Sequence, residues 1–168
     1  MRKVWGVLTV TLFFLVSTAV YAEGIKIGYI NLKDVLDKYQ KVTDGENELI
    51  KDAEAKNSQR EKLVNDIKSL REKIDLLKDT QKEKKQQELD QKVKELQDFT
   101  NETRSGLRQD RDEKFREIMK EVKDVIEEYG QSRNYNIVID DTLLLYKDAN
   151  LDVTQDIIKT LNQRYKKK

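Results

Sequence analysis

The sequence predicts an α+β protein that is mostly α-helical, with a long antiparallel helical hairpin (a coiled-coil arm) on a small β-containing body that oligomerises. Three observations lead to this fold class. Charged residues make up 39% of the 168 residues and aromatic residues only 7%, which is typical of long or paired helices. Proline is absent, so no proline interrupts a helix. Short apolar segments rich in β-branched residues occur close to the two ends of the chain, on either side of a long charged region.

The composition excludes several classes of function. The chain has 33 Lys and Arg residues against 32 Asp and Glu residues. It therefore lacks the large positive net charge that would indicate a nucleic-acid partner. It has no His and no Cys, which excludes thiol chemistry, zinc sites built on these residues and imidazole catalysis. Asp140 and Asp141 are a candidate carboxylate pair, but adjacent acids at a tight turn are usually solvated turn residues. We therefore expect no enzyme activity, no catalytic residue, no cofactor and no metal site.

The first 22 residues have the three parts of a secretory signal peptide. Arg2 and Lys3 form a basic start, Val4–Val16 is an apolar run, and small residues lead up to Ala22. We expect cleavage after Ala22, which removes two positive charges and takes the net charge from +1 to −1. The alternative is an uncleaved membrane anchor, for which the apolar run is short.

Residues 23–45 and 130–168 together are predicted to form the body. Ile25–Ile30 alternates in the way expected of a strand. Asn31 follows it and can cap a short helix. The segment TDGEN around Gly45 predicts a break or bend before the arm begins.

Residues 46–129 are predicted to form the arm. Their apolar residues recur in alternating steps of four and three, which is the heptad spacing of paired helices. The predicted arm seam consists of Leu63, Ile67, Leu70, Ile74, Leu77, Leu89, Val93 and Leu96. A further run, which drifts from the heptad, contains Leu107, Phe115, Ile118, Val122, Val125 and Tyr129.

The predicted tip of the arm lies near residues 78–80. Lys78–Glu88 has no large apolar residue, and Thr80 followed by Glu83 has the spacing of a capping box, which starts a new helix. We therefore expect two helices that fold back on each other. The alternative is one unbroken helix through this region, since neither Gly nor Pro is present.

The segment after the arm is predicted to be a β-hairpin. Gly130 is a plausible helix stop, and the runs YNIVID and LLLYK predict two strands around a turn at Asp140–Thr142. Two strands alone are marginal in water, so their expected partner is the strand Ile25–Ile30. Leu143–Leu145 is apolar on both faces, and open strand edges favour pairing. We therefore expect self-association through the body.

These segments resemble one known family. A chain that begins IKIGYINLKDVL, continues as a long charged helical hairpin and ends NYNIVIDDTLLLYKDANLDVTQDIIKTLN is similar to the Skp, or OmpH-like, periplasmic chaperones. The resemblance covers essentially Ile25–Leu161. It implies a homotrimer in which strands from three chains form a small β-barrel and three tentacle-like arms surround a cavity. It also implies a periplasmic, ATP-independent holdase that keeps unfolded outer-membrane proteins soluble for delivery to the outer membrane.

The resemblance assigns roles to particular residues. It places client contacts on the arm, where Phe99 and Met119 are candidates because the seam does not require them; the alternative is that they belong to the seam. The implied oligomerisation body contains Ile25, Ile27, Tyr29, Ile137, Val138, Ile139, Leu143, Leu144, Leu145, Tyr146, Ile157, Ile158 and Leu161.

Two further expectations concern partners. The resemblance allows lipopolysaccharide or an anionic membrane as a partner, although the near-neutral charge of this chain gives it little electrostatic support. The alternative to a chaperone is a secreted structural spacer or adaptor, which would share the signal, the arm and the oligomerising body. The two functions differ in whether the protein suppresses aggregation of an unfolded outer-membrane protein.

Overall fold

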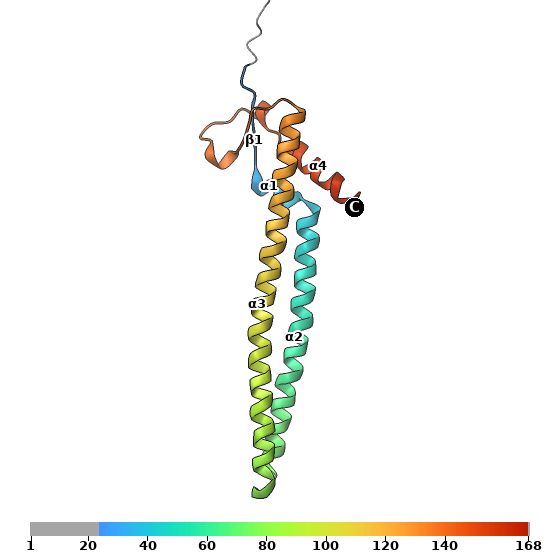
Figure 1. The fold of residues 1–168 in the computed structure, drawn as a ribbon, viewed down its shortest axis with the longest axis vertical. Coiled ribbons are helices and arrows are strands. Elements are labelled where there is room, and N and C mark those ends of the chain that lie inside the picture. Colours follow the sequence, from blue (N-terminus) through green and yellow to red (C-terminus); the bar gives the residue numbers. More distant parts are fainter. Residues whose placement is uncertain (1–23, 168) are drawn as a thin grey trace, which may run out of the picture.

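The computed structural model describes residues 24–167, and it consists of a small body and a long two-helix arm (Figure 1). The predicted signal peptide, residues 1–22, lies outside the described residues. The structure is mostly helical, with long helices and a small strand part, as the sequence predicts. No helix within residues 24–167 is both long and apolar enough to cross a membrane.

The body begins with strand β1 (Ile27–Ile30) and the short helix α1 (Leu32–Lys38). β-Branched and aromatic residues favour the strand. The helix begins after Asn31, whose side-chain Oδ1 accepts a hydrogen bond from the backbone N–H of Asp34 at 2.7 Å, as the sequence predicts. Val35 is fully buried and attaches α1 to the core of the body.

Helix α2 (Gln40–Asp75) begins one residue after α1 ends, so the break predicted at Gly45 is wrong. Tyr39 alone is extended between the two helices, with a ψ of 113°. Its ring is buried and its hydroxyl donates to Glu121 at 2.7 Å, which holds the chain direction here. Gly45 continues the helix beside the Lys114 side chain, so tertiary packing overrides its weak helix propensity.

Helix α3 (Asp79–Ser132) runs back beside α2, so the arm is an antiparallel helical hairpin and not one unbroken helix (Figure 1). The turn occupies residues 76–78, two residues before the predicted tip. Since α3 begins at Asp79 after an extended Lys78, Thr80 does not occupy the capping position predicted for it.

The end of α3 leads into strand β2 (Ile137–Asp140). The helix continues two residues past the predicted stop at Gly130, and Asn134 takes the left-handed conformation (φ 57°) that turns the chain away. Strand β2 pairs with β1 in parallel, with Ile27 opposite Ile137. The first strand therefore lies beside the segment after the arm, as expected.

The predicted β-hairpin does not form, because the segment Leu143–Lys147 is not a strand in the single chain. After β2 the chain makes a 3₁₀ turn, Asp141–Leu143, and a second one at Ala149–Leu151. The side chain of Asp140 accepts from the backbone N–H of Thr142 at 2.9 Å and starts the first turn. The outer edge of β2 is therefore left without a pairing strand among the described residues.

The last helix, α4 (Thr154–Tyr165), crosses the junction between body and arm (Figure 1). Its Ile157, Ile158 and Leu161 are buried in this protomer's own core. The core of the body also takes residues from α3, which the sequence assigns to the arm. Its buried members are Ile30, Val35, Tyr39, Ile118, Val122, Val125, Val153, Ile157, Ile158 and Leu161.

Candidate functional site

The loop after β2 is held against the body by a buried carboxylate. Asp141 accepts a hydrogen bond from the side-chain amide of Asn31 at 3.0 Å and forms an ion pair with Lys147 Nζ at 2.5 Å. The hydrogen bond from Lys147 holds the pKa of Asp141 below its usual range. The Lys147 ammonium also lies 5.2 Å from the centre of the Tyr29 ring. The loop is therefore attached at both ends: Asp141 contacts Asn31 at the end of β1, and Lys147 contacts Tyr29 within β1.

Between these two attachments the loop presents apolar side chains to solvent. Leu143 is 76% exposed, Tyr146 is 84% exposed and Leu145 is fully exposed, while Leu144 is half-buried. Exposed apolar side chains also lie on and next to the strands. We call this surface the body edge; it consists of Ile25, Ile27, Ile137, Leu143, Leu145, Tyr146 and Leu151. Large apolar side chains left exposed in this number favour an interaction surface.

The residues predicted for the oligomerisation body therefore have three environments. Tyr29, Ile157, Ile158 and Leu161 are buried within the protomer, and Val138, Ile139 and Leu144 are half-buried. The exposed members are those of the body edge. Leu151 is an additional exposed residue of this surface that the sequence reading missed, because it follows the polar segment Lys147–Asn150 and belongs to no periodic run.

The outer part of the arm has its own small core. Ile67, Leu70, Ile74 and Leu89 are buried, with Val93 and Leu96 packed against them. Leu63 and Leu77, at the two limits of the α2 seam, are half-buried. The heptad spacing therefore identifies the residues at which the legs α2 and α3 meet, and we call this group the distal core.

The middle of the arm has no core. Among the described residues, no side chain of α2 before Ile67 is buried, and none of α3 between Leu89 and Ile118 is buried. At Gly106 a Cβ atom would meet nothing within 4 Å, so α3 has open space beside it there. Over this interval the legs lie side by side with apolar side chains that are at most half-buried, so the contact that normally stabilises paired helices is thin.

Several apolar side chains of this middle interval face solvent. Ile50 and Phe115 are each 55% exposed, and Val64 is also exposed. Phe115 belongs to the run that drifts from the heptad, and its exposure is consistent with that drift. Sequence patterns did not identify Ile50 and Val64 as exposed apolar residues. Each comes one residue after a leucine of the heptad pattern, Leu49 or Leu63, and so lies outside that pattern.

The two residues named as candidate client contacts, Phe99 and Met119, are half-buried. Each therefore keeps part of its side chain accessible, although neither is as exposed as Phe115. The exposed fraction places Phe115, Ile50 and Val64, and Leu76 at the turn of the arm, ahead of them as the apolar contacts that the arm offers.

Charged side chains cover the rest of the arm. Some of its ion pairs join residues of one helix, such as Lys92 with Glu95 at 3.0 Å, and exposed pairs of this kind contribute little stability. Near the body, Lys114 of α3 pairs with Glu48 of α2 at 2.7 Å and lowers the pKa of that carboxyl. Lys41 of α2 pairs with Glu117 and Glu121 of α3, so several ion pairs join the two legs near the body.

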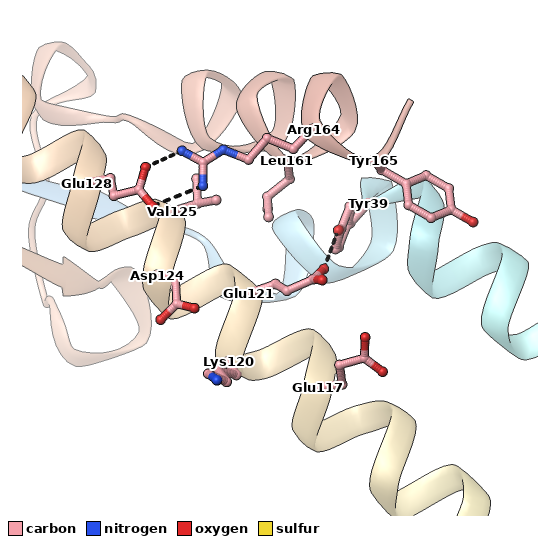
Figure 2. Close-up of a pocket in the computed structure, with 10 residues that line it drawn as sticks. All are labelled: Tyr39, Glu117, Lys120, Glu121, Asp124, Val125, Glu128, Leu161, Arg164 and Tyr165. Atoms are coloured by element: carbon pink, nitrogen blue, oxygen red, sulfur yellow. Dashed lines mark hydrogen bonds and ion pairs between the residues drawn. The ribbon is translucent and has the colours of Figure 1, made fainter. Parts of the chain in front are cut away.

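The described residues form no group of three or more Asp and Glu side chains placed to hold a metal ion. Asp140 and Asp141 point to different partners, Thr142 and the Asn31–Lys147 pair, so they do not act as a carboxylate dyad. A cavity of about 410 Å³ lies where α4 crosses the arm, and its lining combines charged side chains with Val125, Leu161 and two tyrosines (Figure 2). The surfaces available for function are therefore the body edge and the middle of the arm.

Comparison with known proteins agrees with this architecture. A family model described as outer membrane protein (OmpH-like) matches residues 26–161. A crystal structure from Caulobacter crescentus CB15, described as a candidate outer membrane chaperone (OmpH-like), superposes with a TM-score of 0.76. The match covers 84% of this chain and 86% of that chain at 10% identity, so it concerns the fold alone. A search of curated proteins finds no match.

Proposed function

The chain belongs to the OmpH-like family, and we propose that it is an ATP-independent holdase chaperone for unfolded outer-membrane proteins. In this function the protein binds a client, keeps it from aggregating and releases it toward the outer membrane. No bond is made or broken, so no cofactor and no catalytic residue is required. The proposed location is the periplasm, which the family and the predicted signal peptide before Glu23 both favour.

One observation carries the proposal: the middle of the arm exposes apolar side chains and has no core of its own. Ile50, Val64 and Phe115 face solvent on a charged, soluble surface. A holdase has to bind many unrelated apolar segments, for which a single fitted pocket is unsuitable. Sparse apolar contacts spread along an arm bind weakly one by one and add up when several engage the same client.

We further propose that three protomers associate through the body edge. The outer edge of β2 and the loop Leu143–Tyr146 offer unpaired backbone groups and exposed apolar side chains, which favour pairing with another chain. In a trimer the arms would surround one cavity, which separates a bound client from other unfolded chains. Leu145→Asp is expected to convert the trimer into monomers, as measured by native mass spectrometry, because it places a charge in the contact.

Aggregation suppression tests the proposed function. Residues 23–168 are mixed with an outer-membrane β-barrel protein diluted from urea, and light scattering is followed at increasing chaperone concentration. Scattering should fall as the chaperone approaches one trimer per client. A structural spacer would leave scattering unchanged at every ratio, and that result would reject the holdase function. The variant Leu145→Asp is the control: it should be monomeric and should therefore lack the cavity between the arms.

A further inference from the structure

The last turn of the chain contacts the base of the arm through three side chains, which we call the C-terminal brace: Asn162, Arg164 and Tyr165. They lie on the final turn of α4, which crosses the place where α1, α2 and α3 meet. Their partners are in both legs of the arm, as the next two paragraphs describe. One short helix end is therefore attached to both legs at once.

Asn162 spans the single-residue break at Tyr39. Its Oδ1 accepts a hydrogen bond from the backbone N–H of Gln40 at 2.8 Å, and its Nδ2 donates to the backbone carbonyl of Lys38 at 3.0 Å. The last carbonyl of α1 and the first N–H of α2 are both left without a partner by their own helices. One side chain satisfies both groups and so sets the direction in which α2 leaves the body.

The other two members of the brace bind one leg each. The Tyr165 hydroxyl donates to Asp44 of α2 at 2.9 Å, and the Arg164 guanidinium donates two hydrogen bonds to the carboxylate of Glu128 in α3. Figure 2 shows both bonds from Arg164, on the far side of the cavity from Tyr165. The hydrogen bond from Arg164 lowers the pKa of Glu128, as expected for a bidentate pair.

Acidic side chains gather between the legs a short distance along the arm. A gap of about 370 Å³ lies between the legs there. It is lined by five carboxylates and only one cation, namely Glu48, Asp52, Asp110, Glu113 and Glu117 with Lys114, and by Leu49. Glu48 is paired with Lys114 and Glu117 with Lys41, so the unneutralised carboxylates among these described residues are those of Asp52, Asp110 and Glu113. Like charges across the gap favour separation of the legs, and the interval beyond them opposes this only with half-buried side chains.

The legs are thus held together at two places, at the base next to the brace and at the distal core, with an unsupported interval between them. We propose that the C-terminal brace controls how far the two legs separate in the middle of the arm, and hence how much apolar surface the arm offers. When the brace is intact, Leu49, Leu63 and Leu107 stay half-buried between the legs. When it is released, the middle opens and they become accessible. The link to clients rests on the proposed holdase function.

Hydrogen–deuterium exchange of residues 23–168 without any client tests the proposal. Asn162→Ala removes both bonds across the break, and Tyr165→Phe removes only the bond to Asp44 while keeping the ring. Each lost hydrogen bond is expected to speed exchange in residues 49–66 and 97–112 by about fivefold. Exchange in the distal core should not change. Gln163→Ala, an exposed position on the same turn, is the matched control and should match wild type.

Two outcomes would overturn the proposal. One is that the middle of the arm exchanges at the wild-type rate in both variants. The other is that all amides of body and arm accelerate together, which means that the brace only contributes to global stability. Tyr165→Phe is the variant expected to fold normally, because it removes only one oxygen atom from a half-buried side chain. A spin-label pair at Lys62 and Asn101, introduced as cysteines into a chain with no cysteine of its own, should show a longer and broader distance in Asn162→Ala.

The proposed function can fail separately from this inference. If wild-type protein does not suppress aggregation of the client while Asn162→Ala still opens the arm, the holdase function is rejected and the brace is retained. If wild type suppresses aggregation, Asn162→Ala should change the client Kd relative to wild type, with Gln163→Ala unchanged. If Asn162→Ala alters the exchange rate but not the Kd, the brace does not regulate client binding.

Discussion

Asn31 donates a hydrogen bond from its side-chain amide to the carboxylate of Asp141 at 3.0 Å, which joins the end of β1 to the loop after β2. The same Asn31 side chain accepts from Asp34 and so begins α1. One residue therefore connects the first strand, the first helix and the loop that carries the exposed leucines. The loop has little other means of keeping its shape, since Leu143, Leu145 and Tyr146 make no buried contact in the protomer.

Loss of this attachment should weaken self-association. Asp141→Ala removes the acceptor for both Asn31 and Lys147, so the loop should become mobile and the proposed trimer should dissociate at a higher protein concentration. Asp141→Asn keeps an oxygen for Asn31 and should give an intermediate result. Sedimentation equilibrium measures the association constant. If Asp141→Ala associates as tightly as wild type, the loop is not part of the contact.

The pH dependence of association should follow the same carboxyl group. Because Lys147 lowers the pKa of folded Asp141, the group stabilises the attached loop fully above the pKa of an unfolded Asp, about 3.9. That stabilisation is lost as the pH falls through the lower folded value. The fraction of the proposed trimer should therefore drop as the pH falls below about 4. Asp141→Asn should make this part of the profile flatter, and an unchanged profile would contradict the assignment.

The core of the body should be sensitive to truncation. Ile157 is fully buried among residues from α1, α3 and α4, so Ile157→Ala is expected to lower the free energy of unfolding by about 2–5 kcal/mol. Ile157→Val removes one methylene group and should lower it by about 0.5–1.5 kcal/mol. Urea unfolding followed by circular dichroism measures both. Equal effects of the two variants would show that the site is not packed as described.

Client binding should depend on the most exposed aromatic residue of the arm. Phe115→Ser is expected to raise the client Kd by roughly fivefold, because part of an aromatic side chain no longer leaves water on binding. Arg116→Ala, at the next exposed position, is the control. The only tryptophan of the chain is Trp5 in the predicted signal, so fluorescence of a client tryptophan reports binding to residues 23–168 without background. An unchanged Kd for Phe115→Ser would show that Phe115 does not contact the client.

Ionic strength should change the opening of the arm. The carboxylates around the gap between the legs repel one another, and raising ionic strength from 0.01 M to 0.15 M shortens the screening length from about 30 Å to about 8 Å. Hydrogen exchange in residues 49–66 and 97–112 should therefore become slower at the higher ionic strength, while the distal core serves as the internal reference. Faster exchange would show that attraction, as in the pair of Lys114 with Glu48, dominates there.

Local patterns predicted much of this architecture. The four–three spacing from Leu63 to Leu77 identified the distal core, and the position of Asn31 identified the start of α1, because both depend on residues a few positions apart. The run without large apolar residues after Leu77 indicated the turn of the arm to within two residues. The exposure of individual arm residues was less predictable, since Phe115 belongs to an apolar run and yet faces solvent.

The sequence by itself determined that the protein has a charged helical hairpin between two short strand segments, because helix and strand periods are properties of neighbouring residues. Tertiary structure alone decided where α1 gives way to α2 and what happens after β2. The chain turns at Tyr39, and not at Gly45, because the Tyr39 hydroxyl bonds to Glu121 and Asn162 bridges the break. Leu143–Lys147 is not a strand, because the 3₁₀ turn at Asp141–Leu143 and the ion pair of Lys147 with Asp141 hold the segment away from the open edge of β2.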